Sequence, residues 1–399
     1  MKFRYGYLIF ILTASLTIAN CANIKTRDNA NASYWNEVGL RADKNERWND
    51  ALYAFNKAIE INPNYASAYN NRGNTYLNLG NYNQAITDCN KAIEIDPKYV
   101  DAYCNRGLAY RELYNYNQAI ADYNKAIEID PQNANIYYYR GLAYRYSGNY
   151  NRSITDYNKA IEIDPKHADA YNSRGVSYDK LGNYNQAITD YNKAIELDPK
   201  MAKAYNNRGI IYENRGNHNQ AIADYNKAVE LNPKFAIAYC NRGNAYRNLG
   251  NHNQAIADYN KAIELNPKDA TAYYSRGNAY LDIGNHNQSI ADYSKAIEIN
   301  PRHAEAYVGR GLAYDNLGDY NQAIADYNNA IKLNPKDAKI YSNRGNVNRK
   351  LGNYNQAIAD YNKSIELNPR FAIAYYNRGN AYRKLGNYNQ AIADYNKAI

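Results

Sequence analysis

The sequence has little of several residue types that usually carry chemistry or fill a compact core. Its 399 residues contain only 4 cysteines, 5 phenylalanines and 2 tryptophans, although there are 47 tyrosines. Serine is sparse, no glycine-rich phosphate loop occurs, and no cysteine and histidine stand in register with each other. Nucleophilic and phosphoryl-transfer sites need such groups together. We therefore expect a protein that is not an enzyme, with no catalytic residue and no cofactor.

Proline is absent except at ten positions, and the interval between each and the next is constant. The positions are Pro63, Pro97, Pro131, Pro165, Pro199, Pro233, Pro267, Pro301, Pro335 and Pro369. A fixed period of this kind indicates a stack of similar supersecondary units instead of one globular core. Such a stack grows by adding units, so the length does not imply several domains.

The positions of the histidines and cysteines give little support for metal sites or disulfides. Three of the five histidines occupy the same place in consecutive repeats, so stacked helices about 8–10 Å apart separate them. Metal ligands lie about 2 Å from the ion, and we expect no metal site. Cys240 lies four repeats from Cys104, too far for a disulfide. A bridge between Cys89 and Cys104 remains open.

Each repeated unit has the pattern of two helices joined by a turn. In the unit 236–269, Tyr239, Gly243 and Tyr246 share one helical face, and Gly250 supplies a helix stop. A second apolar face follows and ends before Pro267, because the residue that precedes proline avoids the helical region. One such hairpin cannot bury its apolar faces alone, so we expect neighbouring units to stack.

The unit resembles the tetratricopeptide repeat (TPR) in length and at every characteristic position. These positions are Tyr239, Gly243, Tyr246, Ala255, Tyr259, Ala262 and Pro267. The resemblance covers residues 32–399, as ten full repeats and a truncated eleventh. It implies an all-α fold, a right-handed α-solenoid of about eleven units. It also implies that the first helices line a concave groove that binds peptides. The implied groove positions are 2, 5, 6, 9, 12 and 13, counted within each 34-residue unit so that Ala236 is position 1 of the unit 236–269.

The N-terminal segment that ends at Asn31 predicts export. Residues 1–20 read as a signal peptide, with Lys2 and Arg4 before an apolar run of about a dozen residues. The run leads to Cys21, in a context similar to a bacterial lipobox, although Asn20 departs from the usual small residue. We expect lipidation at Cys21, a polar tether at 21–31, and a lipid-anchored position at the periplasmic or outer face of the bacterial cell envelope. A plain secretory signal and a retained membrane helix are the alternatives.

Arginine at position 7 and aspartate at position 23 occur together in ten units, and the first unit lacks both. Arg242 and Asp258 represent them in the unit 236–269. An unpaired buried guanidinium is costly, so we expect one structural ion pair between the two helices of each unit. The alternative is that the arginines face a ligand. The repeated tyrosines are mostly core residues, and the asparagine-rich turns and the Arg/Asp pairs are candidate partners for their hydroxyls.

Asparagine recurs at positions 6 and 9 of the groove. Side-chain amides both donate and accept hydrogen bonds, so a row of them can pair with an extended peptide backbone, similar to the asparagine ladder of O-GlcNAc transferases. Other residues interrupt the row, and the alternative is that asparagine is merely common in this chain. The predicted peptide-binding asparagines are Asn71, Asn105, Asn207, Asn241, Asn343 and Asn377 at position 6, and Asn244, Asn346 and Asn380 at position 9.

Basic residues gather at positions 12 and 13 of the last two units: Arg349, Lys350, Arg383 and Lys384. They make this end of the groove the expected place for an acidic peptide or a terminal carboxylate, as in the carboxylate-clamp TPR proteins, whose full residue set is not matched. A solvated basic face is the alternative.

These features favour a non-enzymatic protein–protein interaction scaffold that binds extended peptide segments in its groove. Its partners would be proteins or peptides, acidic ones among them. The net charge of +9 is spread along the chain and does not argue for nucleic acid. The uncapped last repeat also predicts self-association. Two alternatives remain: a recruiting arm of a larger, glycosyltransferase-like enzyme whose catalytic part is absent here, and a binder of acidic envelope polymers.

Overall fold

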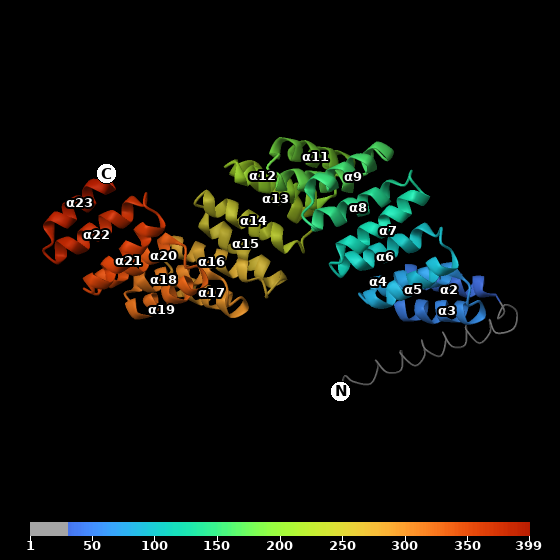
Figure 1. Cartoon of the computed structure of the whole chain (residues 1–399), viewed down its shortest axis with the longest axis horizontal. Coiled ribbons are helices and arrows are strands. Elements are labelled where there is room, and N and C mark those ends of the chain that lie inside the picture. Colours follow the sequence, from blue (N-terminus) through green and yellow to red (C-terminus); the bar gives the residue numbers. More distant parts are fainter. Residues whose placement is uncertain (1–30) are drawn as a thin grey trace, which may run out of the picture. The chain divides into compact units, whose positions relative to one another are not determined.

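The computed structural model describes residues 31–399, and within this range 22 helices follow one another without a strand (Figure 1). This confirms the predicted all-α solenoid of repeated hairpins. The predicted signal peptide, Cys21 and all of the predicted tether except Asn31 lie outside the described residues. Asn31 caps α2 (Ala32–Lys44) by accepting a hydrogen bond from the backbone N–H of Ser33 at 2.9 Å.

The chain divides into two compact units. The first ends at Pro199, and the second begins at Lys200. The first contains α2 (Ala32–Lys44), α3 (Trp48–Ile61), α4 (Ala66–Asn78), α5 (Tyr82–Ile95), α6 (Val100–Glu112), α7 (Tyr116–Ile129), α8 (Ala134–Tyr146), α9 (Tyr150–Ile163), α10 (Ala168–Lys180) and α11 (Tyr184–Leu197).

The second contains α12 (Ala202–Asn214), α13 (His218–Leu231), α14 (Ala236–Asn248), α15 (His252–Leu265), α16 (Ala270–Asp282), α17 (His286–Ile299), α18 (Ala304–Leu317), α19 (Tyr320–Leu333), α20 (Ala338–Lys350), α21 (Tyr354–Leu367), α22 (Ala372–Lys384) and α23 (Tyr388–Ala398).

Glycine and proline end the helices where the sequence predicts. Gly250 adopts a left-handed backbone with φ of 79°, and its N–H donates to the carbonyl of Arg247 at 2.9 Å. The N–H of Asn251 then donates to the carbonyl of Tyr246, which satisfies the open end of α14. At the end of α15, Asn266 is extended, with φ of −138° and ψ of 86°, as expected before Pro267. The two helices therefore fold back on each other.

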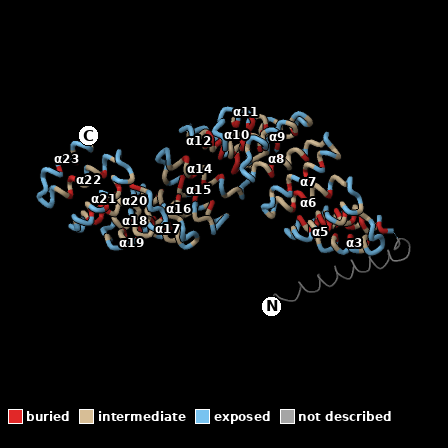
Figure 2. The backbone as a smooth tube through the Cα atoms, in the orientation of Figure 1, coloured by how far each residue is buried: buried red, intermediate tan, exposed pale blue. Residues whose placement is uncertain are grey.

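Alanine and tyrosine fill the space between the paired helices. The Tyr259 side chain is fully buried, and a Cβ placed on Gly243 would lie 2.7 Å from its ring. Glycine is therefore needed here because the ring of α15 packs directly on the backbone of α14. Buried residues lie between successive helices, while the turns are exposed (Figure 2). Within each of the two compact units, the first helix of each hairpin also contacts the first helix of the next hairpin, so these helices form a continuous face. From here on, "first unit" and "second unit" mean these two compact units, and each 34-residue repeat is called a hairpin.

Candidate functional site

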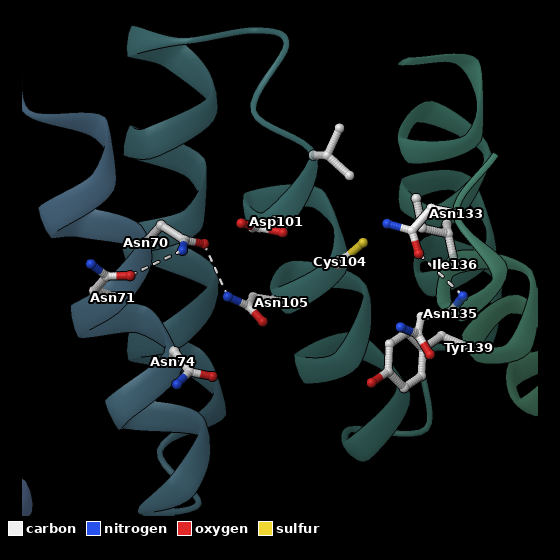
Figure 3. A pocket seen from close by; sticks show the side chains of 11 residues that line it. Asn70, Asn71, Asn74, Asp101, Cys104, Asn105, Asn133, Asn135, Ile136 and Tyr139 are labelled. Carbon is white, nitrogen blue, oxygen red and sulfur yellow. Dashed lines mark hydrogen bonds between the residues drawn. The ribbon is translucent and has the colours of Figure 1, made fainter. Parts of the chain in front are cut away.

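A hollow of about 370 Å³ lies on the first-helix face of the first unit, between α4, α6 and α8 (Figure 3). Its walls are mostly amides, and its lining is Asn70, Asn71, Asn74, Val100, Asp101, Cys104, Asn105, Asn133, Asn135, Ile136 and Tyr139. Two of the predicted groove residues, Asn71 and Asn105, therefore meet at one hollow. A second hollow of about 390 Å³ occupies the equivalent face of α16, α18 and α20, and Asn343 lines it.

Three of the position 6 asparagines are tied to the preceding first helix. Asn71 donates from Nδ2 to Asn36 Oδ1 at 3.0 Å, and Asn105 donates to Asn70 Oδ1 at 3.0 Å. In the second unit Asn241 donates to Asn206 at 2.9 Å. One amide N–H of each is thus used by the fold, and the second N–H is left for a ligand. The position 5 partners were not predicted from the sequence, although the Asn70-Asn71 dipeptide was a signal.

The position 9 asparagines hold the core tyrosines. Asn244 Oδ1 accepts the hydroxyl of the buried Tyr259 at 2.8 Å. The same bond joins Asn346 to Tyr361 and Asn380 to Tyr395. These position 24 tyrosines thus donate to position 9 asparagines, where the sequence predicted the turns or the Arg/Asp pairs, and the asparagines use their carbonyl groups within the fold. Position 4 tyrosines do use the turns: Tyr103, Tyr137 and Tyr341 donate to the carbonyl groups of Pro97, Pro131 and Pro335.

Asn74 is the exception among the position 9 asparagines. Its hairpin carries Cys89 where the others carry the core tyrosine, apart from the first, which carries Phe55, so no hydroxyl reaches Asn74. Among the described residues, its side chain forms no hydrogen bond, and it lines the hollow beside Asn71 and Asn105. Both its donor and its acceptor atoms are therefore available to a ligand. Asn74 was not among the predicted site residues, although Cys89 in place of tyrosine was a signal in the sequence.

The predicted arginine–aspartate pair is present in each of the ten hairpins that carry both residues. Arg242 donates from Nε and Nη2 to the two carboxylate oxygens of Asp258, at 2.7 and 2.6 Å. Its Nη1 donates to Asn226, on the second helix of the preceding hairpin, at 2.8 Å. The hydrogen bond with Asp258 is the main cause that raises the pKa of the Arg242 guanidinium. All three donor nitrogens face the fold, which disfavours the alternative that these arginines face a ligand.

The four basic residues near the last two hairpins are not equivalent. Lys350 Nζ donates to Asp315 Oδ1 at 2.7 Å, so its charge is already balanced. In the described part of the chain, Arg349 Nε is buried without a hydrogen-bond partner. Arg383 and Lys384 are exposed. The basic surface predicted for this end of the groove therefore reduces to Arg349, Arg383 and Lys384.

The cysteines of the described range are free thiols, which rules out the Cys89–Cys104 bridge. Cys104 lines the amide-rich hollow, but burial raises the pKa of its thiol to about 12. The thiol is therefore protonated at neutral pH and is a poor nucleophile. Over residues 31–399, no three His, Cys, Asp or Glu side chains gather as metal ligands would. None of the helices in this range has the length and apolar character needed to cross a membrane.

Models of the tetratricopeptide repeat match most of the chain. One TPR repeat model matches residues 44–80, 109–145, 141–182, 243–284, 277–318, 316–352 and 345–386. Two tetratricopeptide repeat models match 66–99, 168–201 and 202–235, and 89–121 and 224–257. The chain belongs to the tetratricopeptide repeat family. TPR arrays are typical protein–protein interaction scaffolds, and the fold is generally non-catalytic.

Solved structures share this TPR fold. The Cut9–Hcn1 hetero-tetramer structure of APC/C matches at 17% identity with a TM-score of 0.51, over 96% of this chain and 95% of that chain. A TPR protein from Parabacteroides merdae matches at 23% identity with a TM-score of 0.50, over 62% of this chain and 98% of that chain. At these identities the likeness concerns the fold alone. No curated protein gave a significant match.

Proposed function

We propose that this TPR array is a non-enzymatic scaffold that binds extended peptide segments along the groove face of its first helices. The observation that carries this proposal is the amide-rich hollow between α4, α6 and α8 (Figure 3). Asn74 offers a complete amide, and Asn71 and Asn105 each offer an N–H that the fold does not use. Such groups pair with backbone N–H and C=O groups of any sequence, as an extended segment requires.

Side chains of a bound segment would add charge complementarity at α20 and α22, the first helices of the last two hairpins. Arg349, Arg383 and Lys384 carry positive charge that no described carboxylate balances, whereas Lys350 is paired with Asp315. We propose acidic residues in the segment that reaches this surface. Charged groups of this kind add specificity and speed association.

Binding is tested by selecting peptides from a random library displayed on phage against the full chain. Fluorescence polarisation then measures the affinity of the selected peptides. Asn74→Ala should weaken binding about threefold to tenfold, the value of one or two neutral hydrogen bonds. Its melting temperature should not change, because Asn74 makes no bond within the described fold. Asn83→Ala, an exposed asparagine at the start of α5, serves as the control. Selected peptides that bind the Asn74→Ala variant as tightly as wild type contradict the role of the hollow.

We further propose that the protein is anchored to the cell envelope through a lipid at Cys21. The proposal rests on the basic start, the apolar run and the Cys21 context in residues 1–21. Intact-mass measurement of protein from the producing bacterium's membrane fraction should show a chain that starts at Cys21 and carries added acyl mass. A Cys21→Ala variant should lose that mass and leave the membrane fraction. An unmodified, signal-cleaved wild-type chain rules out the anchor.

The last hairpin bears on the proposed self-association. Ile373 and Tyr376 are more than half exposed there and line an apolar hollow with Tyr395. Contact between two copies through this surface stays a prediction, and sedimentation of wild type against an Ile373→Asp variant measures it.

A further inference from the structure

Two turns depart from all the others, and both lie in the first compact unit. In the turn after each described first helix one residue adopts a left-handed backbone, and it is glycine with φ of 74° to 83° in all these hairpins but two. The exceptions are Glu46 in the first hairpin and Tyr114, between α6 and α7, with φ of 62°. A bulky side chain rarely adopts this conformation, which raises the energy of the fold. Strain of this kind is concentrated at functional sites.

Packing does not compensate for the strain at Tyr114. The side chain is 79% exposed. At the equivalent glycines of the other hairpins, a Cβ would meet no atom within 4 Å. A side chain at this position therefore points into open space and contributes nothing to the core. Core packing in the described structure therefore does not explain why tyrosine stands at position 114.

A second departure lies beside the first. Tyr146, the last residue of α8, is 55% exposed, and in every other hairpin this position is polar. Tyr116 connects the two. Its ring is parallel to that of Tyr146, with centroids 6.4 Å apart, and nearly perpendicular to that of Tyr114, at 6.3 Å. Two unusual residues from neighbouring hairpins thus complete one exposed aromatic corner.

The corner is held in place and lined with neutral polar groups. The guanidinium of Arg145 lies 4.5 Å from the ring centroid of Tyr146 and so fixes that ring. The three rings border a hollow of about 670 Å³, which Asn115, Asn117, Gln118 and Ser147 also line. Asn115 makes no capping bond with its side chain, so its amide is available.

The chain contains its own comparison for this site. In the second unit, four repeats later, the places of Tyr114, Tyr116 and Tyr146 are taken by Gly250, His252 and Asp282. Asp282 there accepts a hydrogen bond from Arg247 Nε at 2.7 Å. The repeat therefore folds without the aromatic corner, which separates the three tyrosines from the requirements of the fold.

We propose that Tyr114, Tyr116 and Tyr146 form a stacking site for a neutral saccharide. The C–H face of a pyranose ring packs on exposed aromatic rings, and its hydroxyls, which both donate and accept, match side-chain amides. A polyanion such as nucleic acid fits poorly, because Arg111 is paired with Glu112 at 2.6 Å and Arg145 lies over Tyr146. The site uses none of the groove asparagines, so it stands or fails independently of the peptide-binding proposal.

The test is isothermal titration of the full chain with neutral linear hexasaccharides of glucose, mannose, galactose and N-acetylglucosamine. At least one should bind. The variant Tyr114→Gly/Tyr146→Asp installs the residues of the second unit, and should lose affinity about tenfold or more, as expected for lost stacking. Its melting temperature should be unchanged or higher, because the strain at Tyr114 is removed.

Two further variants make the result decisive. Tyr116→His installs the residue of His252 and should also weaken binding. Tyr388→Ala, the same position in the last hairpin and 64% exposed, should bind as wild type does. The proposal is overturned if none of the four sugars binds, or if the Tyr114→Gly/Tyr146→Asp variant binds as tightly as wild type. It is also overturned if a proline-rich peptide binds with this pattern of losses and the sugars do not.

Discussion

Replacing Asp258 with alanine should lower the free energy of unfolding of its hairpin by about 3–5 kcal/mol. The Asp258 side chain is 8% exposed, and its carboxylate accepts two hydrogen bonds from Arg242. Its removal leaves a guanidinium whose side chain is only 17% exposed without its anion. Because an array unfolds in parts, hydrogen exchange of the amides in α14 and α15 measures the effect better than one melting temperature.

The first hairpin supplies the control, since Val38 and Ala54 stand there in place of the pair. An Arg242→Val/Asp258→Ala variant should therefore recover much of the loss, because removing both partners leaves no unpaired charge. Asp258→Ala alone with unchanged exchange in α14 and α15 contradicts a structural role for the pair. Equal losses in the single and double variants show that packing of the arginine stem matters more than its charge.

Replacing Tyr259 with alanine should cost a similar amount, about 3–5 kcal/mol, for a different reason. The ring is fully buried against Gly243, so truncation leaves a cavity as well as a loss of apolar contact. The hydroxyl bond to Asn244 is lost at the same time. Chemical denaturation with hydrogen exchange should place the loss in the hairpin of α14 and α15 and in the neighbouring α16, whose Ala279 packs on Tyr259.

Two phenylalanine variants separate the cavity from the hydrogen bond. Tyr259→Phe keeps the ring and should cost about 1 kcal/mol. Tyr123→Phe makes the same change where position 9 is Leu108 and the hydroxyl is buried without a partner in the described structure. It should be neutral or stabilising, because an unsatisfied buried hydroxyl is removed. Equal costs for the two substitutions contradict the assigned role of Asn244.

The fold was predictable because its determinants are local and repeated. The proline period, the glycine stops and the shared faces of Tyr239, Gly243 and Tyr246 fix each hairpin within a single repeat. The pairing of Arg242 with Asp258 was also accessible, since both residues are absent from the same hairpin. Co-occurrence within one chain thus carries information that is usually taken from related sequences.

The groove was less predictable, because its contacts join residues that lie one repeat and one residue apart. Asn105 with Asn70 and Lys350 with Asp315 are both separated by 35 residues. This offset follows from how neighbouring first helices are placed against each other, which the period of the repeat does not reveal. The hydrogen bond from Tyr259 to Asn244 was likewise not predictable, because it depends on how far the tyrosine side chain extends across the hairpin.

The third hydrogen bond of each guanidinium affects how such a chain can change in length. Arg242 binds Asn226 of the preceding hairpin, and Arg276 binds Asn260 in the same way. Removal of residues 236–269 would bring Arg276 to Asn226, an identical acceptor. The second helix of each hairpin thus carries the acceptor for the arginine on the first helix of the next hairpin. Gain or loss of whole hairpins preserves these hydrogen bonds, whereas an insertion or deletion within a helix between the two partners moves one partner away from the other.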